Sequence, residues 1–255
     1  MRASLFITCL VDAFQPSTGV AAVQVLRAAG CEVSCPMAQT CCGQPAWNSG
    51  FADDGAKVAR ATLDALEADG ADVVVVPAGS CATMIKVFWP EMFELTGDHQ
   101  AAERARRLGA RTHELSSFLD ERRRSGDLPH MMLADAPTIA YHHSCHMLRE
   151  LRIDEAPLAL AESLGCTIVE WPDDRRCCGF GGLFSMKLPE VSVAMADEKL
   201  RSIPSDAEML VGADGSCLMH LRGRLEHEGR DLPTRHLAEL VAEALAAAAD
   251  SSVTR

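Results

Sequence analysis

Eight of the eleven cysteines in this 255-residue chain form two sets of four with identical spacing. In each set the first cysteine comes 32 positions before an adjacent pair, glycine follows the pair, and the last cysteine comes 39 positions after the pair's second member. An offset of 136 residues relates the two sets, which indicates a tandem repeat. The sets are Cys9, Cys41, Cys42 and Cys81 in the first half, and Cys145, Cys177, Cys178 and Cys217 in the second.

These cysteines predict metal or redox chemistry. Thiolates are soft ligands that suit zinc, copper(I) and iron–sulfur clusters, whereas a disulfide scaffold is not expected in a chain this long in a reducing compartment. The adjacent pair favours a cluster, because neighbouring side chains of an extended backbone point apart and reach two irons more easily than one zinc ion. Gly43 and Gly179 would let the backbone pass close to a bulky ligand and donate N–H groups to sulfur.

Three further cysteines do not belong to the repeat. Cys31, Cys35 and Cys166 lie outside the repeat and are predicted to be small buried core residues, since free cysteine behaves as a small hydrophobic side chain.

Four histidines lie close to cysteines of the second half, and no histidine lies near Cys9. Their side chains could ligate a metal, carry protons, donate hydrogen bonds to a cluster, or be purely structural. They are His142, His143, His146 and His220.

Strands and helices alternate along the chain, which predicts an α/β fold. We expect two tandem homologous α/β domains, at residues 1–125 and 137–255, each with a small parallel sheet flanked by helices. The cysteines follow the predicted strands, so the metal site of each domain is expected at the carboxyl ends of the strands. Strands are predicted at 4–8, 31–35, 72–77, 138–141, 167–170 and 209–212, and helices at 18–29, 54–69, 100–107, 114–123, 156–164, 189–201 and 237–248.

Composition and charge argue against several classes of partner. The net charge is −12 and the only dense basic run is Arg122–Arg124, so nucleic acid is not expected to bind. No segment approaches the roughly 20 apolar residues needed to cross a bilayer, and residues 4–8 read as a strand and not as a signal peptide. A cytoplasmic protein without membrane insertion is therefore predicted. No G-x-G-x-x-G motif follows a strand, so neither a flavin nor a nicotinamide cofactor is expected.

The two C-x31-C-C-G units, each ending in Gly-Ser-Cys, resemble the cysteine-rich CCG-domain family. That family includes cysteine-rich components of heterodisulfide reductase, of glycolate oxidase and of anaerobic glycerol-3-phosphate dehydrogenase, and the likeness is greatest to its lactate-utilisation A members. The resemblance covers the whole chain and implies that the eight cysteines bind two [4Fe-4S] clusters, one per domain. It further implies an electron-transfer subunit, and thus an oxidoreductase component, of a system that oxidises L-lactate to pyruvate together with lactate-utilisation B and C type proteins.

The sequence departs from one pattern of the family. In heterodisulfide reductase the units use five cysteines, including a C-x2-C pair at the end, to hold noncubane clusters. Here Ala78 and Asp214 lie three residues before the last cysteines, and Met84 and His220 lie three residues after them. Four cysteines per unit still suffice for a conventional cluster. A heterodisulfide-reductase-like thiol–disulfide oxidoreductase, a zinc-stapled interaction protein and a metal-free redox switch remain as alternatives.

Overall fold

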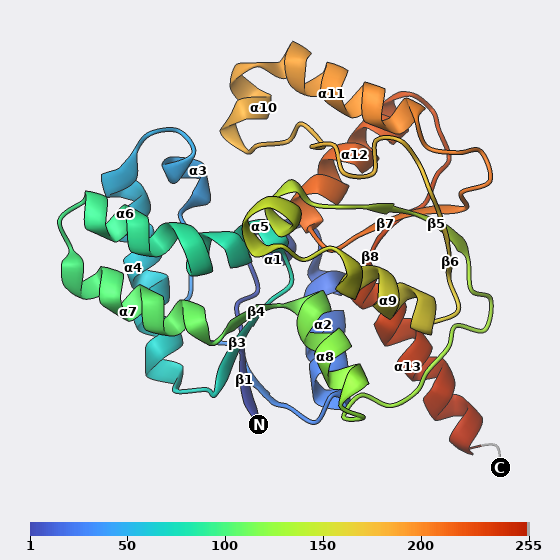
Figure 1. Cartoon of the computed structure of the whole chain (residues 1–255), viewed down its shortest axis with the longest axis horizontal. Coiled ribbons are helices and arrows are strands. Elements are labelled where there is room, and N and C mark those ends of the chain that lie inside the picture. Colours follow the sequence, from blue (N-terminus) through green and yellow to red (C-terminus); the bar gives the residue numbers. More distant parts are fainter. Residues whose placement is uncertain (254–255) are drawn as a thin grey trace.

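The computed structural model describes the backbone of residues 1–253 and the side chains of residues 1–249. It contains two four-stranded sheets whose strands all run parallel (Figure 1). The first has the order β2-β1-β3-β4, formed by β1 (Arg2–Leu5), β2 (Glu32–Ser34), β3 (Val73–Val76) and β4 (Thr112–Glu114). The second has the matching order β6-β5-β7-β8, formed by β5 (Thr138–His142), β6 (Thr167–Val169), β7 (Met209–Gly212) and β8 (Thr234–His236).

Helices connect the strands in both halves. The first half contains α1 (Cys9–Phe14), α2 (Pro16–Ala28), α3 (Gln44–Trp47), α4 (Ala52–Asp69), α5 (Gly79–Thr83), one turn of π-helix η1 (Met84–Phe88), α6 (Trp89–Leu95), α7 (His99–Ala110) and α8 (Leu115–Arg124). The second contains a π-helical turn η2 (Met147–Leu151), α9 (Glu155–Ser163), α10 (Leu183–Lys187), α11 (Pro189–Arg201), α12 (Gly215–His227) and α13 (Leu237–Val253).

The predicted architecture of two tandem α/β units with parallel sheets is confirmed. The fourth strand of each sheet, β4 and β8, is absent from the sequence-based prediction. The first strand also ends earlier than predicted, at Leu5, and Cys9 opens helix α1 instead of lying in a loop. Thr8 precedes that helix with the positive φ of 61°, which is unusual for a β-branched residue, and its hydroxyl caps α1 by accepting from the N–H of Val11.

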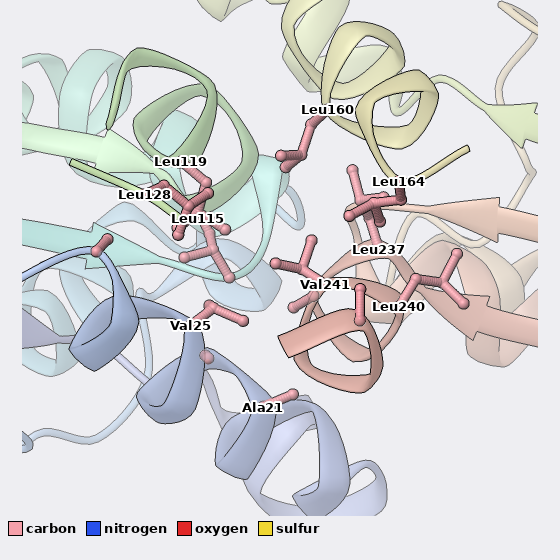
Figure 2. Close-up of a cluster of buried hydrophobic side chains, with 14 of the residues drawn as sticks. Ala21, Val25, Leu115, Leu119, Leu128, Leu160, Leu164, Leu237, Leu240 and Val241 are labelled. Atoms are coloured by element: carbon pink, nitrogen blue, oxygen red, sulfur yellow. The ribbon is translucent and has the colours of Figure 1, made fainter. Parts of the chain in front are cut away.

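The two halves share their largest hydrophobic core. This core lies between the sheets, where α2 packs on α13 and α8 packs on α9. Figure 2 shows side chains of these four helices converging from both halves, among them Val25, Leu119, Leu160 and Val241. The expected connection at 125–137 also contributes, because it buries Leu128, Met131 and Leu133 in this core. The inner faces of the two sheets are therefore covered jointly by elements of both halves.

Smaller cores cover the outer faces of the sheets. One lies under α4, α6 and α7 and includes Trp89 and Phe93, and the other lies under α11 and α12 and includes Trp171 and Leu221. Each of these outer cores also contains two buried cysteines of the repeat. The buried cysteines of each candidate site are therefore part of the outer core of their half. Within residues 1–253, none of the helices combines the length and the apolar character needed to cross a lipid bilayer.

Glu114, at the end of β4, is a buried acid whose ionisation should set a pH dependence of stability. Its side chain caps α8 by accepting from the N–H of Ser117 at 3.0 Å and from the hydroxyl of Ser116 at 2.5 Å. Burial raises the pKa of Glu114 from 4.5 to about 7. The folded chain thus keeps this proton to a higher pH than the unfolded chain does. As a result, the free energy of unfolding falls as the pH rises between these two values.

We expect Glu114→Gln, which mimics the protonated acid, to stabilise the protein above pH 7 by up to about 3 kcal/mol and to have little effect near pH 5. Urea unfolding at both pH values, without oxygen, measures the difference. Glu121→Gln, at an exposed position of the same helix, is the matched control and should change neither value. An equal effect of Glu114→Gln at the two pH values would contradict the assignment.

Candidate metal centres

The cysteines of each set meet at the carboxyl edge of their sheet. In the first half, Cys9 opens α1 after β1, the adjacent pair follows β2, and Cys81 lies in the first turn of α5 after β3. The second half repeats this arrangement around β5, β6 and β7. In both sets the second member of the pair and the last cysteine are buried, while the other two are more accessible. Each candidate centre therefore has a buried side and a side nearer the solvent.

The first set is a continuous network of thiols. The sulfur atoms of Cys9 and Cys41 lie 3.6 Å apart. Hydrogen bonds from Cys42 and Cys9 lower the pKa of Cys41 to about 3, so this thiolate is the shared acceptor of the group. The pKa of Cys42 is raised by its hydrogen bonds to Cys41 and Cys81 and by burial. All four predicted residues of the first half thus belong to one network.

The second set has the same internal order. The sulfur atoms of Cys145 and Cys177 are 3.9 Å apart, and hydrogen bonds from Cys145 and Cys178 lower the pKa of Cys177 to about 2. Cys178 interacts with Cys177 and Cys217, which raise its pKa together with burial. The N–H of Gly179 donates to the sulfur of Cys177 at 3.5 Å, as expected for the glycine after the pair.

The members of each adjacent pair do not diverge as predicted. Cys41 and Cys42 interact through their thiols, and so do Cys177 and Cys178. The prediction assumed an extended backbone, whereas the pairs lie in irregular segments after the edge strands, where both side chains can turn to the same site.

The glycine after each pair is required by its close approach to a helix, a reason that the sequence-based expectation did not include. Gly43 and Gly179 have φ values of +83° and +88°. A Cβ atom at Gly43 would lie 2.8 Å from the carbonyl oxygen of Gly55 in α4, and one at Gly179 would lie 2.7 Å from that of Ser192 in α11. Both the left-handed backbone and this close approach exclude a larger residue.

The carbonyl groups around the two pairs are held by different residues, none of which the sequence analysis identifies. In the first half the indole N–H of Trp89 donates to the carbonyl of Cys42 at 2.7 Å, and the hydroxyl of Thr62 donates to that of Cys41 at 3.1 Å. In the second half Lys199 of α11 donates to the carbonyls of three residues just before the pair. The distances are 3.0 Å to the carbonyl of Asp174 and 2.9 Å to that of Arg176, and the third acceptor is the carbonyl of Asp173.

Lys199 is fully buried, with its ammonium group 4.5 Å from the centre of the Trp171 ring. Burial lowers its pKa to about 8. The repeat places the apolar residue Leu63 at the corresponding position of the first half. A charged residue opposite a leucine was the signal in the sequence that could have identified it.

Two of the three cysteines outside the repeat lie where they were predicted. Cys31 and Cys166 are buried in the shared core. The prediction for Cys35 is wrong, because this residue is exposed and its sulfur accepts a hydrogen bond from the amide of Gln39 at 3.1 Å. It follows β2, which lies at the edge of the sheet, and Pro36 turns the chain away from the core.

The four histidines have distinct surroundings. His142 is buried with a ring nitrogen, the sulfur of Cys178 and the sulfur of Cys217 all within 4.8 Å of one another. The ring of His143 instead lies 3.4 Å from the carboxylate of Asp154.

His146 reaches the first half, where its Nε2 atom is 3.2 Å from the side-chain amide of Gln44. His220 lies 3.3 Å from the hydroxyl of Ser192 and packs against the ring of Phe180. Among the residues whose side chains are described, His142 is the histidine that forms a group of three possible metal ligands with cysteines.

Asp214 joins the two centres. It is buried, and its Oδ2 atom accepts from the N–H of Ser80 at 2.8 Å, while its Oδ1 atom accepts from the N–H and the hydroxyl of Ser216 at 3.2 and 2.5 Å. Ser80 and Ser216 directly precede Cys81 and Cys217. A single carboxylate thus holds the first turns of α5 and α12, one from each half.

We expect Asp214→Ala, which copies the Ala78 of the first half, to lower the free energy of unfolding by roughly 2–4 kcal/mol, because it leaves buried N–H groups without an acceptor. Asp214→Asn keeps one carbonyl oxygen and should cost less. Chemical denaturation of both variants measures these losses. Equal stability of the wild-type protein and Asp214→Ala would show that this carboxylate does not join the halves.

The donor set of each centre suits a metal ion or an iron–sulfur cluster. Four thiols converge in each half, which is the number of ligands that a zinc ion or a conventional four-iron cluster takes. The hydrogen bonds that lower the pKa values of Cys41 and Cys177 favour the thiolate, the form that binds metal, in each set.

Comparisons with known proteins agree with this geometry. The model of the cysteine-rich CCG domain matches residues 3–86 and 139–222, so each matched range contains all four cysteines of its half. Lactate utilization protein A 2 of Bacillus cereus (strain AH820) is 41% identical over 247 residues, which cover 96% of this chain and 99% of that protein. Lactate utilization protein A of Geobacillus thermodenitrificans (strain NG80-2) is 44% identical over 243 residues, which cover 94% of this chain and 98% of that protein. With two tandem cysteine-rich CCG domains and this likeness along nearly its whole length, the chain belongs to the lactate utilization protein A family.

Proposed function

We propose that this protein is the cytoplasmic iron–sulfur component of a system that oxidises L-lactate to pyruvate, with one [4Fe-4S] cluster in each half. Cys9, Cys41, Cys42 and Cys81 would hold the first cluster, and the four corresponding cysteines of the second half would hold the other. The observation that carries the proposal is the convergence of four thiols at the carboxyl edge of each sheet. The names of the relatives supply the link to lactate.

The stoichiometry of the reaction fits two centres. Oxidation of lactate to pyruvate breaks the C–H and O–H bonds of the alcohol carbon and releases two electrons and two protons. Iron–sulfur clusters supply one-electron transfer, so two clusters match the two electrons. The carbon chemistry would take place on partner proteins, for which we propose the lactate-utilisation B and C types.

Two structural features support passage of electrons through the chain. Cys9 is exposed, and this gives the first centre a side that a partner protein can approach. The Asp214 carboxylate provides a hydrogen-bonded path between the residues that precede Cys81 and Cys217. The two centres would thus be joined through one side chain instead of through solvent.

One observation favours zinc as a second candidate. A tetrahedral zinc ion with sulfur ligands at about 2.3 Å places the sulfur atoms about 3.8 Å apart. The Cys9–Cys41 and Cys145–Cys177 separations of 3.6 and 3.9 Å are close to that value. A zinc-stapled protein would be colourless and would not accept electrons, so the two candidates differ in simple measurements.

The test of the proposed function is reduction by lactate. Protein purified without oxygen is mixed with the B and C type partners and L-lactate, and its visible absorption is followed. Bleaching with L-lactate, but not when either partner is omitted, is the expected result. Intact clusters that dithionite bleaches and lactate does not would contradict the proposal, and bleaching by glycolate alone would reassign the donor.

A further inference from the structure

His142 occupies a position where the repeat does not hold. It ends β5 and is 1% exposed, and the corresponding residue of the first half is Phe6, which is fully buried in the same outer core as Cys42. A histidine thus replaces an apolar residue at a buried position next to the cysteines. A difference in solvent exposure does not explain why one half has histidine and the other phenylalanine, because both side chains are buried.

Neither ring nitrogen of His142 has a hydrogen-bond partner among the residues whose side chains are described. Leaving a buried polar group unpaired costs about 1–3 kcal/mol, and for this reason buried polar groups in native proteins nearly always have partners. The neighbouring His143 differs, because its ring nitrogen Nδ1 lies 3.4 Å from the Asp154 carboxylate. Among the described side chains another buried histidine, His236, lacks a partner at Nε2 alone, whereas both ring nitrogens of His142 lack one.

The ring is placed where a metal ligand would be. A nitrogen of His142 and the sulfur atoms of Cys178 and Cys217 lie within 4.8 Å of one another, and all three residues are buried. Imidazole and thiolate are both ligands of iron and zinc.

We propose that His142 is a direct ligand of the metal centre in the second half, a role that has no counterpart in the first half. The inference rests on one part of the proposed function, namely that the second half holds a metal centre. Its consequence is an asymmetric pair of centres, with cysteine ligands alone in the first half and cysteines plus one imidazole in the second. Because a conventional cluster takes four ligands, the imidazole would take the place of one of the four thiolates of the second half. Imidazole in place of thiolate raises the potential of an iron–sulfur centre, so the second centre would be the stronger electron acceptor.

The experiment uses the full chain, purified without oxygen, in a Cys42→Ser background that retains only the second centre. Electron spin echo spectroscopy of the reduced protein is expected to show hyperfine coupling to a histidine nitrogen. In His142→Phe, which restores the residue of the first half, this coupling should disappear. In His142→Cys the centre should remain, without the coupling and with a lower potential. His143→Gln, at the adjacent buried position, is the matched control and should keep the coupling.

Two outcomes would overturn the inference while leaving the proposed function intact. These are a second centre with iron but no nitrogen coupling, and a coupling that survives in His142→Phe. If the protein holds zinc instead of iron, the proposed function fails, and cobalt(II) substitution then tests His142 separately. A strongly shifted imidazole N–H proton that is lost in His142→Phe would support ligation, and its absence from the wild-type protein would refute it.

Discussion

Cys178→Ser is expected to reduce the iron and sulfide bound per chain to about half, with the loss confined to the second centre. The physical reason is that the Cys178 thiol lies at the middle of its network, where it contacts both Cys177 and Cys217. A serine hydroxyl is a hard, weakly acidic donor and replaces a soft thiolate ligand poorly. Metal and sulfide analysis gives the loss, and electron paramagnetic resonance shows which centre remains.

Two variants control for this result. Cys42→Ser is the equivalent change in the first half, and it should leave the second centre instead. Cys166→Ser alters a cysteine that is buried in the shared core away from both sets, so the iron content should not change, although a buried hydroxyl costs about 1–3 kcal/mol of stability. If Cys166→Ser lost iron, the assignment of ligands by the repeat would be wrong.

Lys199→Met is expected to make the second centre labile and to lower the free energy of unfolding by roughly 3–5 kcal/mol. The ammonium group donates to three backbone carbonyls of the segment that leads into Cys177, and the variant removes these three hydrogen bonds. The methionine side chain keeps much of the apolar packing on Trp171, so the loss is one of hydrogen bonds and charge. Denaturation under anaerobic conditions and the rate of iron release to a chelator measure the two effects.

The first centre provides an internal reference for this variant. Its pair is held by Trp89 and Thr62, which Lys199→Met does not touch, so its iron should be released at the wild-type rate. Lys187→Met, at an exposed position of α10, should change neither stability nor iron release. Equal acceleration of release from both centres would mean that Lys199 acts through global stability and not through the position of its loop.

The parts of the fold that have strong local signals could be predicted from the sequence. A continuous valine run marks β3, and a glycine marks the end of α4, where Gly70 takes the left-handed conformation with φ 64°. The strands β4 and β8 escape prediction because each has three residues and includes a histidine or an acid. So short a segment shows no alternation of apolar and polar residues, and only pairing with a longer neighbouring strand makes it a strand.

The residues of the candidate centres could also be predicted only in part. Periodic spacing identifies the eight cysteines, and parallel strands explain why they converge. The spacing of the cysteines cannot identify Lys199, whose partners are backbone carbonyls, and its only signal in the sequence is its place opposite Leu63 in the repeat. It also cannot separate His142 from His143, since the direction of adjacent side chains depends on where β5 ends. The shared core could not be predicted either. The sequence pattern of each half shows that one face of its sheet is apolar, but it does not show that elements of the other half cover this face.

The most direct test of the central claim is the content of iron, acid-labile sulfide and zinc per chain, measured with the visible spectrum on protein purified without oxygen. Two four-iron clusters predict a brown protein with about eight irons and eight sulfides per chain and little zinc. A colourless protein with one or two zinc ions and no sulfide would contradict the account, since its cysteines would then be structural.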